Sequence, residues 1–196
     1  KVLAVIGPLL SKTAAAVSPL ADSAKLPIVL MAPREGLPDL GEYVFRHALT
    51  ASAQVRALVT YAMNNLGLKR FAILYPLEPY GTEMETLFKV ELSSQKGELV
   101  SEAAYEPKST DFKSAIEKIK TEAFPDVPKD SPPPERTGLF IPDYYDSVGL
   151  LVPQLAFYEI KTAQLLGPSG WNYPQLMKIA GEHVDGAVFV DVFFAE

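Results

Sequence analysis

The chain has 196 residues, of which 48% are apolar and 21% charged, and its formal net charge is −6. This composition suits a globular protein with a sizeable core and excludes collagen-like repeats and a wholly disordered chain. The negative charge argues against nucleic acid or an anionic membrane as the main partner. The absence of cysteine excludes disulfides and thiolate chemistry. Only His47 and His183 could supply imidazole, so we expect no His-rich metal site and no cofactor.

Apolar runs and helix-prone stretches alternate along the first quarter of the chain. Three short apolar runs predict strands, at residues 2–6, 26–31 and 43–46. The Ala-rich stretch 11–24 predicts a helix that Ser11 could cap. Residues 32–42 contain two prolines and two glycines and are therefore predicted to form a loop.

The rest of the chain continues the alternation. Helices are predicted from apolar residues at spacings of three and four, at 51–66, 81–95, 111–120 and 146–158, followed by a short helix near Pro174. Strands are predicted at 71–75, 99–105, 138–141, 163–167 and 186–190. Thr82 and Glu85 fit a capping box, Asp111 and Asp146 could cap their helices, and Leu176, Met177 and Ile179 are expected to pack. The proline-rich stretch 124–137 is predicted to be an exposed loop.

This order predicts an α/β fold, with a parallel sheet that carries helices on both faces. In such sheets ligands bind beyond the carboxyl ends of the strands. The loops between a strand and the following helix are therefore the candidate functional segments, at 7–13, 32–39, 76–82, 142–147 and 167–173.

The first three of these loops each offer one kind of contact. Ser11 and Thr13 lie at a helix start, where free N–H groups could hold an anion, although a simple N-cap explains the same residues. Arg34 could bind a carboxylate through its guanidinium, or be a solvated surface charge. Tyr80 could stack on a ligand, or close the edge of the sheet.

The fourth loop has the highest density of functional side chains. Asp143 and Tyr144 follow a strand end directly and are the better ligand candidates, whereas Asp146 is expected only to cap the next helix. Trp171, in the fifth loop, is either a packing anchor or a platform for a ligand.

An enzyme is not indicated. There is no Gly-x-Ser-x-Gly motif, and neither His47 nor His183 has an evident Ser or Asp partner. Asp143 and Glu78 could lie across a cleft, but nothing marks either one as a proton donor. We therefore predict no catalytic residues, and a hydrolase is the least favoured function.

Several segments, in order, resemble the type I periplasmic binding proteins of the leucine/isoleucine/valine-binding class. In the first quarter these are the segment from Val5 to Ser11, Leu26-Pro27-Ile28, Ala32-Pro33 and Tyr43-Val44-Phe45-Arg46. Further along they are the segment from Arg70 to Tyr75, Pro79-Tyr80-Gly81, Thr110-Asp111-Phe112, Leu166-Gly167-Pro168, and Gly181-Glu182 with Gly186-Ala187-Val188. The resemblance covers nearly the whole chain.

The resemblance implies two lobes joined by hinge strands, with a ligand held in the cleft between them. It implies that the chain is the middle of such a protein and is incomplete at both ends, with a partial first lobe at 1–48 and a second α/β lobe at 49–196. It also implies a bacterial periplasmic receptor for a small, amino-acid-like ligand that delivers to an ABC permease. A lipid anchor through a segment before Lys1 is left open.

The resemblance also implies roles for particular residues. Ser11 and Thr13 match the site of the ligand carboxylate, and Tyr80 and Tyr144 match aromatic residues that cover the ligand. Ser169 falls where the family has an acidic residue for the ligand ammonium.

Two further residues complete the expected site. Asp143 is the candidate to replace the acidic residue that Ser169 cannot supply. Arg34 lies in a loop that usually offers a small hydroxyl residue, and Gly36 in the same loop has none.

The second half is also similar to the penicillin-binding protein activator lipoproteins. The similar segments are Phe140-Ile141-Pro142-Asp143, the segment from Val152 to Tyr158, Leu165-Leu166-Gly167 and Trp171. This resemblance implies an alternative function, in which the protein regulates a peptidoglycan synthase by direct contact and the cleft is structural.

Overall fold

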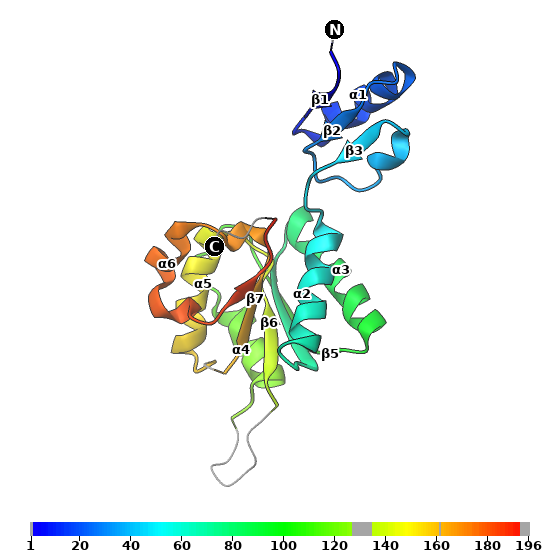
Figure 1. Cartoon of the computed structure of the whole chain (residues 1–196). Coiled ribbons are helices and arrows are strands. Elements are labelled where there is room, and N and C mark those ends of the chain that lie inside the picture. Colours follow the sequence, from blue (N-terminus) through cyan, green and yellow to red (C-terminus); the bar gives the residue numbers. More distant parts are fainter. Residues whose placement is uncertain (1, 127–134, 161, 193–196) are drawn as a thin grey trace. The chain divides into compact units, whose positions relative to one another are not determined.

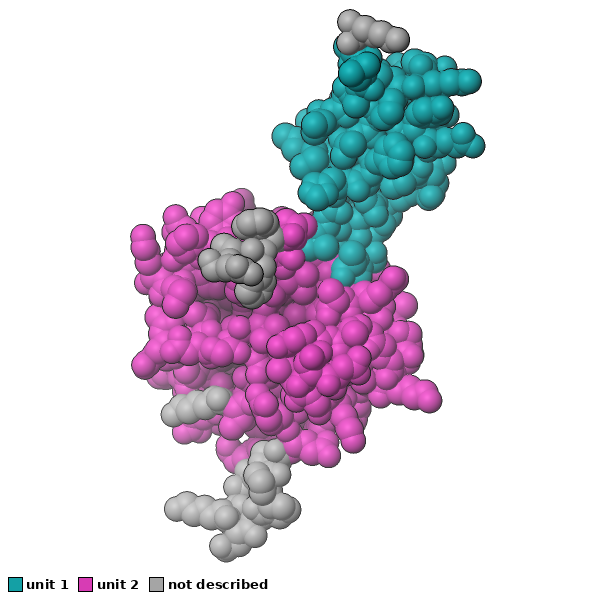
Figure 2. Space-filling model, in the orientation of Figure 1, with its two compact units in different colours: residues 1–53 teal, residues 54–196 magenta. Residues whose placement is uncertain are grey.

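The computed structural model describes residues 2–126, 135–160 and 162–192 (Figure 1). The chain divides into two compact units, residues 1–53 and residues 54–196 (Figure 2). The lobes expected at 1–48 and 49–196 remain a prediction about the working protein. Among the described helices, none combines the length and the apolar character that crossing a membrane requires.

The first unit is a small parallel sheet with one long helix. Its strands are β1 (Val5–Ile6), β2 (Ile28–Leu30) and β3 (Val44–Arg46), which pair in that order. Its helices are α1 (Ser11–Ser23) and the short 3-10 helix η1 (Pro38–Leu40). The three predicted strands are confirmed, each shorter than its apolar run, and η1 lies inside the segment that we expected to be loop throughout.

The second unit is a five-stranded sheet in which every strand pair is parallel, in the order β5-β4-β6-β7-β8. Its strands are β4 (Arg70–Pro76), β5 (Glu98–Tyr105), β6 (Thr137–Phe140), β7 (Gln164–Gly167) and β8 (Val188–Phe189). Its helices are α3 (Pro79–Gln95), α4 (Lys113–Ala123), α5 (Tyr145–Phe157), α6 (Pro174–Ala180) and the 3-10 helices η2 (Ser169–Trp171) and η3 (Gly181–Val184). Helix α2 (Ala51–Asn64) contains the boundary between the units. The predicted α/β class is confirmed.

Helices cover both faces of this second sheet (Figure 1). Ala72 and Leu74 of β4 belong to the core cluster that also contains residues of α4, α5 and α6. Phe71 alternates with them and meets Phe88 of α3 edge to face, with ring centroids 6.0 Å apart. Because successive side chains of a strand point to opposite faces, this strand contributes to two cores at once.

Two of the expected helix caps are wrong. The N-cap of α1 is Leu10, and no side chain bonds the free N–H groups there, because Ser11 is already the first helical residue. Helix α3 begins at Pro79, before the expected capping box, since proline suits the first helical position. Thr82 therefore bonds back to the carbonyl of Glu78, and Glu85 forms an ion pair with Lys89 at 2.7 Å.

The other two expected caps and the packing of α6 also differ in part. Asp111 accepts a hydrogen bond from the Lys113 N–H at 2.9 Å, but it precedes the N-cap of α4, which is Phe112. Asp146 lies within the first turn of α5, and Tyr144 occupies the N-cap. Leu176 is buried as expected, but Met177 and Ile179 are both exposed, because only one side of the short helix α6 is buried. Most of the expected loop 124–137, namely 127–134, lies outside the described residues.

Candidate functional site

The strand order of the second sheet reverses between β4 and β6. The chain passes from β4 through α3 to β5 on one side, and from β6 through α5 to β7 on the other. Helix α3 covers one face and α5 the other, so the loops that follow β4 and β6 leave the sheet toward opposite faces. In open parallel sheets, ligands bind at such a point, beyond the carboxyl ends of the strands. Tyr80 lies in the first turn of α3, and Tyr144 is the N-cap of α5.

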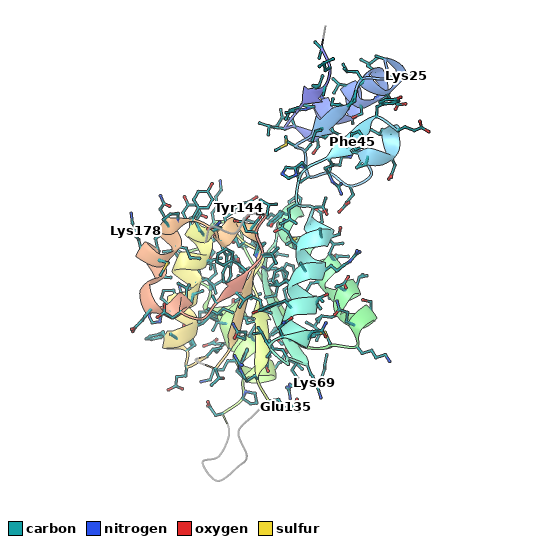
Figure 3. All side chains as sticks on the ribbon, in the orientation of Figure 1. Lys25, Phe45, Lys69, Glu135, Tyr144 and Lys178 are labelled. Carbon is teal, nitrogen blue, oxygen red and sulfur yellow. The ribbon has the colours of Figure 1, made fainter. Side chains whose placement is uncertain are left out.

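The rings of Tyr80 and Tyr144 stack on each other at this end of the sheet. Their centroids are 5.5 Å apart and their planes differ by 27°. Tyr144 remains 50% exposed, and Tyr80 is half-buried. Burial, followed by the neighbouring Tyr144 and Asp143, raises the pKa of Tyr80 far above its usual value, so its phenol stays neutral. Figure 3 shows Tyr144 at the opposite end of the second unit from Lys69 and Glu135, which precede β4 and β6.

Asp143 holds the backbone of Tyr144 in place. It accepts hydrogen bonds from the Tyr105 hydroxyl, at 2.7 Å on Oδ2, and from the Tyr144 N–H, at 2.7 Å on Oδ1. The Asp143 residue is only 5% exposed. Burial and the adjacent carboxylate raise the pKa of Tyr105 above its usual range, so this phenol remains a donor. Asp143 is therefore engaged inside the protein, at the place where we expected it to meet a ligand.

Trp171 is a packing anchor for the same end of the sheet. Its indole is buried, and Nε1 donates to the carbonyl of Ile141 at 3.2 Å. A Cβ on Gly167 would lie 2.2 Å from Cδ2 of the indole, so the ring rests directly on that glycine. Of the two interpretations of Trp171, the structure supports packing, because a buried ring offers no face to a ligand.

Two further residues of this region were not identified from the sequence. Tyr105 is the last residue of β5 and therefore lies at the same carboxyl end of the strands as Asp143. Its place at the end of a predicted strand could have indicated this position. Gln54 of α2 is buried and accepts a hydrogen bond from the Ser169 N–H at 2.9 Å. No local pattern connects two residues so far apart in the chain.

The candidate residues of the first unit are more open. Ser11 is half-buried at the first position of α1, and Thr13 and Arg34 are exposed. Within the described residues, the side chains of these three make no hydrogen bond or ion pair. Ser11 and Thr13 therefore share one turn of α1, whereas Arg34 lies apart from them in the loop after β2. In the second unit, Asp143, Tyr144 and Tyr80 lie together at the carboxyl ends of β4 and β6.

A small polar network of Glu35, Ser52 and Arg46, beside Arg34, was also not predicted from the sequence. Glu35 accepts a hydrogen bond from the Ser52 hydroxyl at 2.5 Å and lies 3.4 Å from Nη1 of Arg46. Arg46 also donates to the carbonyl of Arg34 at 3.0 Å. Partial burial alone would raise the pKa of Glu35, but the hydroxyls of Ser52 and Thr50 and the charge of Arg46 lower it overall. This network holds the loop after β2 against the end of β3.

Neither unit offers an evident metal centre. Across the ranges that the structure describes, no group of three or more His, Asp or Glu side chains is placed to hold a metal ion. At the carboxyl ends of β4 and β6, the group that is open to a ligand is the half-exposed ring of Tyr144, which offers an aromatic surface for stacking.

Comparison with known proteins gives a consistent result. Residues 1–196 match the family model described as "Periplasmic binding protein". A leucine-binding protein LivK of Thermotoga maritima is 24% identical, with a TM-score of 0.69, and the match covers 98% of this chain and 51% of that one. A putative branched-chain amino acid ABC transporter protein of Rhodospirillum rubrum is 16% identical, with a TM-score of 0.80, and the match covers 98% and 52%.

A third solved structure carries a different ligand. It is a solute-binding protein of an ABC transporter from Rhodopseudomonas palustris in complex with 3,4-dihydroxybenzoic acid, 22% identical with a TM-score of 0.60, covering 94% of this chain and 48% of that one. At these identities the three structures show the fold alone, and this chain spans about half the length of each. No curated protein matches the sequence.

Proposed function

Since this chain belongs to the periplasmic binding protein family, we propose that it forms part of a non-enzymatic periplasmic receptor for a small, polar, amino-acid-like solute. The receptor would deliver its ligand to an ABC permease. Binding in a cleft between lobes, with closure upon the ligand, is carried over from the family resemblance and belongs to the same proposal.

The observation that carries this proposal is the stacked pair of Tyr80 and Tyr144 at the carboxyl ends of β4 and β6. Open parallel sheets bind ligands at this point, where the strand order reverses. A half-exposed ring that is held in place by its neighbours provides contact area at a low cost in conformational entropy.

The first unit would supply polar contacts. Ser11 and Thr13 carry hydroxyls at the start of α1 and are proposed to bind the anionic end of the solute. Arg34 has an exposed guanidinium that could pair with a carboxylate. Asp143 is proposed to support the tyrosine pair, because it is buried and its two oxygens already accept hydrogen bonds.

The solved relatives point to two ligand chemistries. One is named a leucine-binding protein, and another was solved with an aromatic acid. Both kinds of ligand carry a carboxylate, so a small carboxylate-bearing solute is the common expectation for this chain.

A thermal-shift screen of the natural full-length protein tests the proposal. The panel contains amino acids, aromatic acids and muropeptides, and a true ligand at about 100 times its Kd should stabilise the protein by about 2.7 kcal/mol. Tyr144→Ala should abolish the shift, and Tyr61→Ala, which removes an exposed ring on α2, should leave it unchanged. No stabilisation by any compound, together with binding to a peptidoglycan synthase, would instead favour the regulator of cell-wall synthesis.

A further inference from the structure

A cavity lies at the end of the second unit that is away from Tyr80 and Tyr144. Its volume is about 430 Å³, and its lining comes from the amino ends of β6, β7 and β8 and from the last turns of α5. Figure 3 places Glu135, which precedes β6, at the opposite end of this unit from Tyr144. Cavities that hold small molecules measure about 300–1,000 Å³. We propose that this cavity is a second binding site, for a zwitterionic peptide of about two residues with an apolar side chain.

Arg136 provides the positive side of the cavity. Its Nη2 donates to Oε1 of Gln164 at 2.7 Å, and Gln164, only 9% exposed, donates through Nε2 to the carbonyl of Gly186 at 2.7 Å. A buried amide therefore fixes the guanidinium, and the hydrogen bond to it uses one of several N–H donors. A guanidinium binds a carboxylate through two parallel hydrogen bonds, so Arg136 is assigned to the carboxylate of the peptide.

Glu182 and Asp185 provide the negative side of the same cavity. Both are exposed, and they lie in η3 and directly after it. Within the described residues, no ion pair joins either carboxylate to Arg136. Opposite charges that line one cavity without pairing complement a ligand that carries both signs, so a zwitterion suits this lining better than a simple anion or cation. These two carboxylates are assigned to the ammonium of the peptide.

The strand order indicates the length of the peptide. Arg136 directly precedes β6, Asp185 lies just before β8, and β7 runs between these two strands. Neighbouring strands lie about 4.8 Å apart, so the two backbones are separated by roughly 10 Å. A single amino acid carries both of its charges on one residue, whereas each further residue adds up to about 3.5 Å. A dipeptide, met by the long Arg136 side chain, therefore spans the cavity better than an amino acid does.

The cavity also has an apolar part. Leu155 of α5 and Leu165 of β7 are buried in its lining, and Ala156 and Ala163 are half-buried beside them. An apolar side chain of the peptide gains from leaving water for this part of the lining.

Titration calorimetry with the dipeptide alanyl-leucine, on the natural full-length protein, tests the proposal. Its N-acetyl derivative lacks the ammonium, its C-terminal amide lacks the carboxylate, and alanyl-glycine lacks the apolar side chain. We expect the amide and alanyl-glycine to bind about tenfold more weakly than alanyl-leucine, and the N-acetyl derivative at least about threefold more weakly. No binding of alanyl-leucine, or equal binding of all four compounds, would overturn the proposal.

A first pair of variants tests the carboxylate partner. Arg136→Gln should weaken the binding of alanyl-leucine about tenfold. Lys178→Gln removes an exposed cation of α6 that is not part of the lining, and it should leave binding unchanged. Thermal unfolding of both variants checks that each is folded. Equal effects of the two substitutions would contradict the assignment of Arg136.

A second pair of variants tests the ammonium partners. The double variant Glu182→Gln with Asp185→Asn should weaken binding at least about threefold and should remove the difference between alanyl-leucine and its N-acetyl derivative. The matched control is Glu42→Gln with Asp39→Asn, which removes two exposed carboxylates of the first unit. If the N-acetyl derivative remains the weaker ligand in the double variant, the ammonium is bound elsewhere and the assignment is wrong.

This site is independent of the proposed solute site, and Tyr144→Ala separates the two. We expect this variant to lose the solute and to bind alanyl-leucine as the wild type does. If alanyl-leucine binding depends on Tyr144 and not on Arg136, the second site is wrong and the receptor function stands. If alanyl-leucine binds through Arg136 and no solute stabilises the protein, the receptor function fails and the second site stands.

Discussion

The two units of the molecule use their polar and apolar groups differently. In the second unit, Phe71 and Leu74 of β4 are fully buried, and Asp143 bonds Tyr105 inside the protein. In the first unit, Ile6 is 82% exposed and the main side-chain network, around Glu35, lies at the surface. A five-stranded sheet with helices on both faces can therefore fix an aromatic surface, while a sheet of two- and three-residue strands leaves its candidate residues open.

Separating the two parts should give the largest effect. A piece with residues 49–196, which retains the Thr50 cap of α2, should unfold cooperatively on heating, because it keeps the second core whole. A piece with residues 1–48 should be largely unfolded, since its core is small and chains of about 40–60 residues are marginally stable. Circular dichroism during a thermal scan measures both. A cooperative transition in residues 1–48 would contradict the expected difference in stability between the two parts.

The next largest effect is expected where Trp171 rests on the second sheet. Gly167→Ala places a Cβ against the indole and should destabilise the protein by about 2–3 kcal/mol, because a well-packed core does not accept extra volume. The midpoint of thermal unfolding should fall by roughly 5–10 °C. Ser169→Ala is the matched control, since the described hydrogen bond of Ser169 uses its backbone N–H.

The fluorescence of Trp171, the only tryptophan in the chain, provides a second readout. It should shift to the red in Gly167→Ala if the indole is displaced into water. A variant that loses no stability and keeps a buried indole would show that this contact is looser than the structure indicates.

Hydrophobic periodicity was sufficient to predict the α/β class and the order of the helices and strands, whereas the expectation of two lobes came from the family resemblance. The apolar positions of α2 and α4 fall at helical spacing and are buried as expected. Each predicted strand overlaps an observed strand along the sequence. The errors are local, as in the start of α3, where the missed signal was Pro79 at a first helical position.

The candidate site was predictable only in part. Tyr80 and Tyr144 were predicted to lie in strand-to-helix loops. This places both residues at the carboxyl ends of the strands, because parallel strands bring these ends together. Their mutual stacking, and the bond from Tyr105 to Asp143, depend on the strand order β5-β4-β6, which no local pattern encodes. A carboxylate in a loop gives the same sequence signal whether it is buried or open.

Removing the phenol that supports Asp143 tests the buried half of the comparison. Tyr105→Phe leaves this carboxylate with one donor fewer in a buried site and should lower the free energy of unfolding by about 1–3 kcal/mol. Tyr43→Phe in the first unit should change the free energy of unfolding by less than about 0.5 kcal/mol, because within the described residues the Tyr43 hydroxyl makes no hydrogen bond. Urea denaturation measures both variants. Equal losses would remove the distinction between the units.

The same phenol predicts a response to alkaline pH. The pKa of Tyr105 in the folded protein is raised above its usual value of 10.0, so the neutral form is favoured by folding. The contribution of this neutral phenol to the free energy of unfolding is complete below about pH 10. It is lost as the pH rises further, because Tyr105 ionises first in the unfolded chain. Stability measured by urea denaturation between about pH 8 and about pH 11 should therefore fall less steeply in Tyr105→Phe than in the wild type. Parallel curves would show that Tyr105 ionises normally.

The smallest effect is expected at the surface network of the first unit. Glu35→Gln should lower stability by no more than about 0.5 kcal/mol at neutral pH, because the Glu35 side chain is 53% exposed and water screens its pair with Arg46. The pKa of Glu35 is lowered by folding, so its contribution is present above the usual value of 4.5 and is lost as the pH falls below it. The variant and the wild type should therefore converge in acid, which urea denaturation at neutral and acid pH can detect. A loss of 2 kcal/mol or more would mean that this network is as strongly buried as the one around Asp143.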